Sequence, residues 1–234
     1  MVKEAFPQAR VLRMDADTTK GKDGHEEILS AFAAHEADVL IGTQMIVKGH
    51  DFANVTLVGI VAADISLNES DYHSGERTFQ LLTQAVGRAG RGSEPGVAII
   101  QTYQPENYAV VTSAAQDYNR FYAQEIAYRG LLGYPPCSHI LGIQVSSESK
   151  KDAYAQADIL AKLIRQVDDK VIIMGPEDAY IGKLKDVFRR VIYLKDADYD
   201  RLVKIKDSID KFLLEQKQYR NTTTWFDFDP INTL

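Results

Sequence analysis

Short apolar runs dominate the first hundred residues, and each run ends at polar or glycine positions. Runs of this kind are typical of buried strands. Four strands are predicted in this part of the chain, at residues 11–14, 38–41, 55–63 and 97–103. The third run is almost unbroken, as expected of a strand that is covered on both faces in a parallel sheet.

Stretches with apolar residues at three- and four-residue spacing separate these runs, and they predict helices at residues 25–37 and 79–86. Strands that alternate with helices indicate an α/β fold, in which a parallel sheet has flanking helices. Ligands bind such folds at the carboxyl ends of the strands. Gly42, Thr43 and the loop after Val61 lie at such ends.

The pattern changes beyond residue 104. A long helix is predicted from Pro105 to Gly130, and a Pro-Pro pair at 135–136 marks a boundary. The order strand, helix, strand, strand, helix, strand follows, which indicates a ferredoxin-like α+β sandwich. Its strands are predicted at 139–146, 170–174, 188–194 and 222–228, and its helices at 149–167 and 199–214. The expected domains are 1–104 and 137–234, joined by a connection at 105–136.

The chain has 234 residues, a net charge of −6 at pH 7 and one cysteine. A negative net charge argues against general coating of nucleic acid, so any contact with nucleic acid is expected to be local. The single cysteine, Cys137, has no partner for a disulfide. No apolar run reaches membrane-spanning length and no signal peptide begins the chain, so we expect a cytoplasmic protein that does not contact a membrane.

The clearest chemical signal is the sequence Gln84-x-x-Gly87-Arg88-x-Gly90-Arg91. Two arginines three residues apart, each beside a glycine, follow an apolar helical run. Rigid guanidinium groups on a glycine-bearing turn suit a phosphate ligand, because a polyanion can approach the backbone closely there. The alternative is a glycine-rich connection with solvated arginines.

A second signal extends from Gly42 to Phe52, between two predicted strands. The hydroxyl of Thr43 and nearby backbone N–H groups can hold a nucleic-acid phosphate, and Asp51 can accept hydrogen bonds from a ribose hydroxyl. A capped helix start followed by a turn is the alternative interpretation.

Together the two segments resemble motifs V and VI of superfamily 2 helicases. Residues 43–52 read Thr-x-x-x-x-Lys-Gly-x-Asp-Phe, and residues 84–91 read Gln-x-x-Gly-Arg-x-Gly-Arg. A wider set of segments is similar to the PriA family of bacterial replication-restart helicases, also called primosomal protein N-prime. Those segments are 15–19, 40–58, 74–91, 122–129, 134–136 and 228–230. The resemblance spans nearly the whole chain.

The resemblance implies a role for each matching position. Arg88 and Arg91 would reach the phosphates of ATP, with Arg91 the first choice as arginine finger, and Gln84 would position the nucleotide or its attacking water. Gly49 and Asp51 would bind the nucleotide, with Asp51 at the ribose. The residues that would face the DNA backbone are Gly42, Thr43, Gln44 and Lys48.

Three features of the family are missing from the sequence. No phosphate-binding loop of the form Gly-x-x-x-x-Gly-Lys-(Ser/Thr) occurs, and the nearest approach, Gly175 to Lys183, has the wrong spacing and is followed by Leu184. An Asp-Glu box for Mg²⁺ and zinc-binding cysteine pairs are also missing. The chain therefore looks like a carboxy-terminal fragment that is inactive alone, whereas the full enzyme would bind ATP and Mg²⁺.

A basic set near the end of the chain is a weaker signal. Lys183, Lys185 and Arg189, together with Arg190 and Lys195, are expected either to meet DNA phosphates or to be ordinary solvated charges. Both interpretations stay open.

Other residue types point to structural roles. The histidines lack metal-ligand spacing, so no metal site is expected in this chain. Tyr108, Tyr118 and Tyr122 follow helical spacing and are expected in the core rather than as platforms for stacked bases.

The resemblance implies the carboxy-terminal part of an ATP-dependent 3′-to-5′ DNA helicase that acts in replication restart and primosome assembly. This part would contain most of the second RecA-like lobe and the ferredoxin-like domain. Its partners would be forked, branched and single-stranded DNA, together with replication-restart and helicase-loading proteins. Two alternatives stay open: a non-enzymatic module that binds nucleic acid or protein, and another superfamily 2 helicase such as a branch-migration enzyme.

Overall fold

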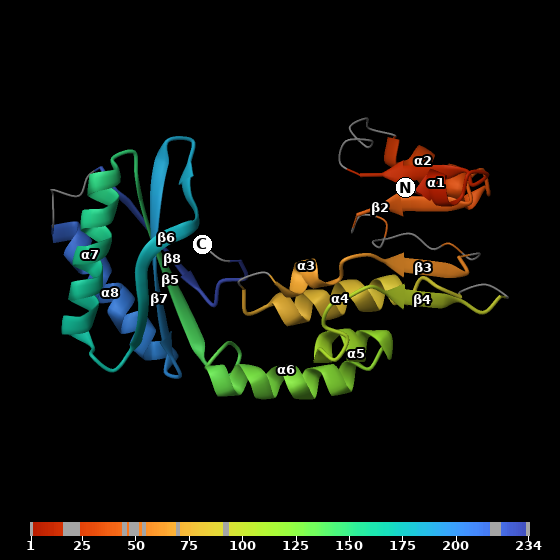
Figure 1. Cartoon of the computed structure of the whole chain (residues 1–234). Helices are drawn as coiled ribbons and strands as arrows, with labels where there is room; N and C mark the ends of the chain where they lie inside the picture. The colour runs from red at the N-terminus through yellow and green to blue at the C-terminus, as the bar shows by residue number, and fades with distance from the viewer. Residues whose placement is uncertain are drawn as a thin grey trace. The chain divides into compact units, whose positions relative to one another are not determined.

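The chain folds into two compact units (Figure 1). The computed structural model describes residues 2–15, 24–43, 46, 52, 55–68, 71–90, 94–215 and 221–232. Unit 1 comprises residues 1–69 and 74–122, and unit 2 comprises residues 70–73 and 123–234. The short segment 70–73 therefore belongs to unit 2, although it lies in sequence between two stretches of unit 1.

Unit 1 contains two parallel strand pairs. Strand β1 (Val11–Met14) pairs with β2 (Val39–Gly42), and β3 (Leu57–Ile60) pairs with β4 (Val97–Ile100). The order of the strands in sequence and their parallel pairing confirm the predicted α/β class.

Strand β3 is shorter and more exposed than its apolar sequence predicts. Leu57 in β3 and Ile99 in β4 are exposed, whereas Ile60 and Ile100 pack against Leu82. Exposed and half-buried residues thus alternate along both strands. Within the described residues, the prediction of a strand covered on both faces is wrong, because an apolar run does not reveal how many faces other elements cover.

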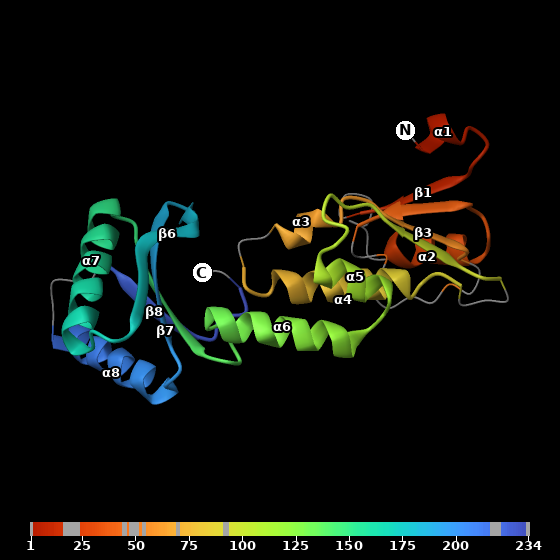
Figure 2. The same ribbon diagram turned by 60° about the horizontal axis from the view of Figure 1, so that its bottom comes forward.

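Five helices are described for unit 1: α1 (Val2–Ala5), α2 (Gly24–Ala33), α3 (Asp64–Leu67), α4 (Ser74–Val86) and α5 (Tyr108–Ala114). The buried residues of α4 recur at three- and four-residue spacing, so one side of this helix faces the core. Helices α4 and α5 pack side by side (Figure 2). Phe79 of α4 stacks on Phe121 with ring centroids 4.1 Å apart.

The long helix predicted from residue 105 to 130 is broken, and that prediction is wrong. Helix α5 ends at Ala114, and α6 (Tyr118–Leu132) begins after Gln116, whose φ is 53°. The carboxylate of Asp117 accepts a hydrogen bond from the backbone N–H of Arg120 at 2.9 Å, which satisfies a donor in the first turn of α6. Apolar spacing continues across this break, so periodicity alone does not detect it.

The buried side of α6 also differs from the predicted one. Its buried residues are Phe121, Glu125 and Arg129, four residues apart. Tyr118 and Tyr122 are 61% and 52% exposed, so the prediction that they lie in the core is wrong.

Unit 2 has the predicted order of strands and helices. Its strands are β5 (His139–Ser147), β6 (Ile172–Leu184), β7 (Val187–Asp196) and β8 (Thr223–Phe228), and its helices are α7 (Lys150–Val167) and α8 (Tyr199–Glu215). The sheet has the order β6-β7-β5-β8, and every neighbouring pair is antiparallel. This arrangement confirms the ferredoxin-like sandwich.

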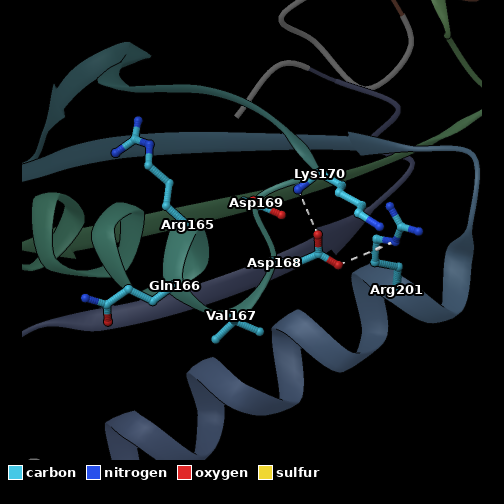
Figure 3. A pocket seen from close by; sticks show the side chains of 7 residues that line it. All are labelled: Arg165, Gln166, Val167, Asp168, Asp169, Lys170 and Arg201. Carbon is cyan, nitrogen blue, oxygen red and sulfur yellow. Dashed lines mark hydrogen bonds and ion pairs between the residues drawn. The ribbon is translucent and has the colours of Figure 1, made fainter.

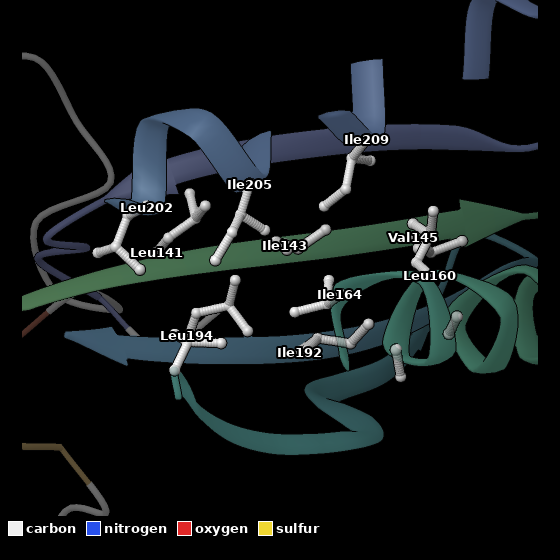
Figure 4. Close-up of a cluster of buried hydrophobic side chains, with 13 residues drawn as sticks. Leu141, Ile143, Val145, Leu160, Ile164, Ile192, Leu194, Leu202, Ile205 and Ile209 are labelled. Atoms are coloured by element: carbon white, nitrogen blue, oxygen red, sulfur yellow. The ribbon is translucent and has the colours of Figure 1, made fainter. Parts of the chain in front are cut away.

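One continuous apolar core holds unit 2 together (Figure 4). Alternate residues of β5 and β7 point toward the two helices, which both lie on the same face of the sheet. Fully buried members are Leu141, Ile143, Val145, Leu160, Ile164, Ile192, Leu194, Leu202, Ile205 and Ile209. The strands contribute every second residue to this core, and the helices contribute residues three or four positions apart.

Strand β6 continues past Gly175-Pro176, where the sequence predicted its end. The register with β7 shifts between Met174 and Glu177, and Gly175 has a φ of 92°. Since β6 lies at the edge of the sheet, the missing N–H of Pro176 removes no hydrogen bond from a central ladder. No helix in the described part of the chain is long and apolar enough to cross a membrane.

Candidate nucleotide and DNA site

Helix α4 carries the first part of the double-arginine motif. Leu82 and Ala85 face the core, whereas Gln84 lies on the exposed side of the helix. The helix ends at Val86, and a turn follows. In this turn the backbone N–H of Arg88 donates to the carbonyl of Ala85 at 3.0 Å. Arg88 is half-buried at this turn, so its guanidinium group is partly sheltered from water.

A close backbone approach and a positive φ require glycine at position 90 of this turn. Gly90 has a φ of 74°, and its N–H donates to the carbonyl of Val55 at 2.9 Å. A Cβ atom on Gly90 would lie 2.6 Å from the backbone N of Gly96, and a Cβ on Gly87 would lie 3.2 Å from the carbonyl oxygen of Thr83. A side chain on Gly90 would displace the turn that presents Arg88, whereas one on Gly87 would require its neighbours to shift by only a few tenths of an ångström.

The second predicted segment begins at the carboxyl end of β2. Gly42 ends the strand opposite Met14, and a Cβ on Gly42 would overlap the carbonyl oxygen of that residue. Thr43 follows with an exposed side chain, and its carbonyl accepts the N–H of Ile46 at 3.1 Å. Thr43 is therefore presented at the strand end, as expected for a ligand site of an α/β fold.

Five predicted site residues lie outside the described residues. They are Gln44, Lys48, Gly49, Asp51 and Arg91. The described part of unit 1 thus carries Gln84 and Arg88 at the end of α4, and Gly42 and Thr43 at the end of β2.

The sequence reasoning missed Asp64, a buried carboxylate that follows β3. It accepts hydrogen bonds from the Thr102 hydroxyl at 2.7 Å and from the Tyr103 N–H at 3.0 Å, so it ties together the segments that follow β3 and β4. The hydrogen bond from Thr102 is the largest cause that lowers the pKa of Asp64. The sequence did contain a signal for Asp64, namely an acidic residue directly after the apolar run at 55–63.

The basic set of unit 2 divides into two groups. Lys183, Lys185 and Arg189 lie at the turn end of the β6–β7 hairpin, where the backbone of Lys185 and Asp186 has φ values of 48° and 65°. Lys183 pairs with Asp186 at 2.8 Å, and the Nε of Arg189 donates to the carbonyl of Ile181 at 3.0 Å. Lys183 and Lys185 are exposed.

The other two basic residues have structural partners. Arg190 contacts Asp178 at 3.0 Å and donates to the carbonyl of Pro176 at 2.6 Å. Lys195 is 8% exposed, and its Nζ donates to the carbonyl of Leu132 at 2.8 Å. Of the five residues in this basic set, Lys183, Lys185 and Arg189 of the hairpin therefore remain for contact with a polyanion.

Two histidines lie beside carboxylates, one close in sequence and one 90 residues away. The Nδ1 of His73 lies 3.3 Å from Asp71, and the Nδ1 of His139 lies 3.0 Å from Asp229. Among the described residues, no group of three or more potential ligands is placed to hold a metal ion.

A pocket of about 400 Å³ lies at the end of α7 (Figure 3). Its lining mixes the cations Arg165, Lys170 and Arg201 with two aspartates, and Arg201 lies 3.5 Å from Asp168. None of the predicted site residues lines this pocket.

Comparison with known proteins identifies both units. The family described as "Helicase conserved C-terminal domain", the RecA-like second lobe of helicases, matches residues 1–93. The family described as "Primosomal protein N C-terminal domain" matches residues 130–231. The same chain thus joins a helicase lobe to a domain that is named after primosomal protein N, and relatives with the printed name "Replication restart protein PriA" match both parts. This chain belongs to the PriA family.

Several PriA relatives extend across nearly all of the chain. "Replication restart protein PriA" of Bacillus subtilis (strain 168) is 40% identical over 230 residues, which cover 97% of this chain and 28% of the relative. The protein of that name from Synechocystis is 40% identical over 201 residues, covering 86% of this chain and 24% of the relative. The Chlamydia pneumoniae relative is 35% identical over 234 residues, covering 100% of this chain and 31% of the relative. The chain thus spans less than a third of the length of these PriA proteins.

Proposed function

We propose that this chain supplies the second RecA-like lobe and the C-terminal domain of an ATP-dependent 3′-to-5′ DNA helicase that acts in replication restart and primosome assembly. One observation carries the proposal. In a chain of the PriA family, Arg88 lies half-buried on a turn in which Gly90 packs closely against the backbone of Gly96, directly after a helix that is fixed in the core. Such a turn suits an arginine that contacts phosphate.

The residues present fit one wall of a nucleotide site. Arg88, and Arg91 by its place in the motif, would contact the phosphates, and Gln84 would orient the nucleotide or its attacking water. Gly49 and Asp51 would contact the nucleotide from the other segment. Fixed cations are needed at this point because negative charge is redistributed over the transferred phosphoryl group in the transition state. ATP with Mg²⁺ would supply that phosphoryl group.

The DNA contacts would come from two places. Gly42, Thr43, Gln44 and Lys48 would face the backbone of a single strand, since backbone N–H and hydroxyl groups at a strand end suit phosphate oxygens. The hairpin set Lys183, Lys185 and Arg189 would add contacts to forked or branched DNA. Replication-restart and helicase-loading proteins in the cytoplasm would complete the assembly.

The chain alone is expected neither to hydrolyse ATP nor to bind it tightly. Its sequence has no phosphate-binding loop with lysine and no Asp-Glu box for Mg²⁺. The ATP phosphates would therefore be contacted only by the arginines of the double-arginine motif. Isothermal titration of ATP into the purified 234 residues checks this expectation. Hydrolysis stimulated by DNA in this preparation would contradict it.

The arginine role is tested in a chimaera in which this chain replaces the matching segment of the Bacillus subtilis relative. Arg88→Ala and Arg91→Ala should each lower the kcat of DNA-stimulated ATP hydrolysis on the order of a thousandfold, because the transition state loses a fixed cation. Arg88→Lys should recover little, since an ammonium group cannot replace the planar fork. Arg165→Ala, which removes an exposed arginine of α7, is the matched control and should hydrolyse ATP normally.

Circular dichroism and thermal unfolding would show that each variant is folded. Unchanged hydrolysis by both folded alanine variants would reject the proposed role of the motif. The chain would then be better described as an interaction module that does not take part in catalysis.

A further inference from the structure

The end of helix α5 has the hydrogen-bond pattern of a Schellman motif. The backbone N–H of Gln116 donates to the carbonyl of Ser113 at 3.1 Å, and that of Asp117 donates to the carbonyl of Thr112 at 2.9 Å. Gln116 follows Ala115, the cap of the helix, and its φ of 53° lies in the left-handed region. Both bonds satisfy carbonyl groups that the end of a helix leaves without partners.

Glutamine is an unfavourable residue at this position. A helix that ends in this way usually has glycine there, because a Cβ atom in the left-handed conformation crowds the following carbonyl oxygen. Departures from such a local preference are expected at functional sites, where a side chain is needed in spite of its cost. The side chain of Gln116, which glycine would lack, is therefore the feature that requires a role.

The side-chain amide of Gln116 lies against the first glycine of the double-arginine motif. A Cβ atom on Gly87 would be 3.2 Å from the Nε2 of Gln116, 3.2 Å from the carbonyl oxygen of Thr83 and 3.7 Å from that of Gln84. The amide and the carboxyl end of α4 thus enclose the same space beside Gly87. Gln116 is otherwise exposed, so this contact comes from the end of its side chain.

The backbone that carries Gln116 is fixed within unit 1. Helices α4 and α5 pack side by side, and Ala109 and Val110 of α5 are buried. After Gln116, the carboxylate of Asp117 accepts the backbone N–H of Arg120 in the first turn of α6. The amide therefore projects toward Gly87 from a turn that is held on both sides.

The turn that carries Arg88 has fewer constraints of its own. The N–H of Gly87 donates to the carbonyl of Thr83 at 3.0 Å, and the N–H of Ala89 donates to that of Val86 at 3.2 Å. Hydrogen bonds at the end of a helix open more readily than those in its middle. A side chain that packs against the turn from a neighbouring segment therefore limits its movement.

We propose that Gln116 is a positioning residue: its amide packs on Gly87 and so holds the turn that presents Arg88 for phosphoryl transfer. This inference rests on the proposed function. All the residues that carry it belong to unit 1. Gln116 acts through the turn and not by contact with the reacting atoms.

Hydrogen exchange in the 234-residue chain tests the contact in the absence of ATP. Gln116→Gly should raise amide exchange at Gly87 and Arg88 roughly tenfold, because no side chain then opposes opening of the turn. The amides of α5 should keep their protection, since glycine is favoured at the end of that helix. Gln116→Met keeps the length of the side chain and should stay close to the wild type. Unchanged exchange at Gly87 and Arg88 in the glycine variant would overturn the proposal.

Kinetics of the chimaera test the effect on catalysis. Gln116→Gly should lower the kcat of DNA-stimulated ATP hydrolysis about tenfold, as expected when a catalytic group is slightly misplaced. The KM for ATP should change less than about twofold, since the variant removes no contact with the nucleotide. Gln116→Met should restore most of the rate. A wild-type kcat in the glycine variant would contradict the positioning role.

His35→Gly is the matched control, because His35 ends α2 in the same way. Its N–H donates to the carbonyl of Phe32 at 3.1 Å, the N–H of Glu36 donates to that of Ala31 at 2.9 Å, and its φ is 58°. Both glycine variants should melt no lower than the wild type, since glycine adopts this conformation freely. His35→Gly should leave kcat unchanged. An equal loss of kcat in both variants would overturn the proposal, as it would show a general effect of glycine on unit 1.

The two proposals fail in different ways. If Arg88→Ala and Arg91→Ala have no effect on hydrolysis, the proposed function fails, and hydrogen exchange still decides whether Gln116 holds the turn. If the arginine variants are inactive and Gln116→Gly hydrolyses ATP normally, the proposed function stands and the role of Gln116 is rejected.

Discussion

Asp64 shows how a single carboxylate organises the strand ends of unit 1. It is 8% exposed and accepts hydrogen bonds from Thr102 and Tyr103, which follow β4. The position is one at which α/β proteins bind ligands, yet here the carboxylate satisfies backbone and hydroxyl donors of the protein itself. Its contribution is to hold together the ends of β3 and β4 beside α4.

Replacement of this carboxylate should make the stability of the chain depend differently on pH. Hydrogen bonds lower the pKa of Asp64 from its ordinary value of 3.8, so the folded chain binds this proton more weakly than the unfolded chain does. The stabilisation is therefore present above pH 3.8 and is lost as the pH falls through the lowered pKa. Asp64→Asn should lower the melting temperature at pH 7, and the difference from the wild type should shrink below about pH 4.

Thermal unfolding monitored by circular dichroism between pH 7 and pH 3 would measure this difference. Asp169→Asn, at an exposed position of unit 2, is the control and should follow the wild type. A difference that stays constant with pH would mean that the charge of Asp64 contributes nothing.

The two sides of helix α4 have different roles. Its buried side packs on α5, β3 and β4, and its other side carries Gln84. The aromatic contact between Phe79 and Phe121 is central to the packing, since both residues are at most 5% exposed. The position of the turn that carries Arg88 therefore depends on Phe79 and Phe121, which lie in the core and contact no ligand.

Truncation of this contact should weaken unit 1 strongly. Phe79→Ala should lower the free energy of unfolding by about 3–5 kcal/mol, because it removes buried apolar surface and leaves a cavity. Phe79→Leu, which retains most of the volume, should cost less than about 2 kcal/mol. Urea denaturation of the chain gives both values.

The control for Phe79 is Tyr103→Ala, because Tyr103 is 94% exposed in the same unit. It should change the free energy of unfolding by no more than about 0.5 kcal/mol. A small effect of Phe79→Ala would show that the helix is held mainly by other contacts.

The charge of the whole chain restricts how it can bind DNA. With a net charge of −6, the chain repels a polyanion at a distance, so affinity has to come from small basic areas. The turn end of the β6–β7 hairpin is such an area, because Lys183, Lys185 and Arg189 lie there and two of them are exposed.

The triple change of Lys183, Lys185 and Arg189 to alanine should weaken binding of forked DNA to this chain. Each lost contact with a phosphate of a duplex arm removes about 0.9 from the slope of log affinity against log salt, so the slope should fall by about 3. Fluorescence anisotropy at several salt concentrations measures it. A matched variant, with the exposed helix residues Lys151, Lys162 and Lys204 changed to alanine, should keep the wild-type slope. Equal slopes in all three proteins would exclude the hairpin as a DNA contact.

Much of unit 2 could be predicted because its signals are local. The helix predicted at 149–167 is observed as Lys150–Val167 with Ser149 as its cap, and the last strand is observed at Thr223–Phe228. Both follow from apolar spacing within one element. Unit 1 was predicted less well, because its strands are short and because a positive φ at Gln116 interrupts an otherwise regular pattern.

The candidate site likewise has residues with local signals in the sequence and residues whose partners are distant in sequence. The motif positions Thr43, Gln84 and Arg88 were predicted from residue type and spacing and stay predictions, and the structure explains the neighbouring Gly42 and Gly90 by close backbone approaches. Asp64 was missed because its importance comes from Thr102, 38 residues away. The structural pairing of Lys195 was likewise missed, since its partner Leu132 is 63 residues away.

Local patterning alone thus determined the types of most elements, their order and the place of the double-arginine motif in the sequence, because periodicity and the chemistry of arginine and glycine act over a few residues. Only the tertiary structure decided which faces of the strands are covered and that Tyr72 packs within unit 2. The contact between Tyr72 and Pro230 joins residues 158 positions apart, and no spacing rule reaches across such a separation. Contacts of this kind form because the folded chain buries distant apolar and polar groups together.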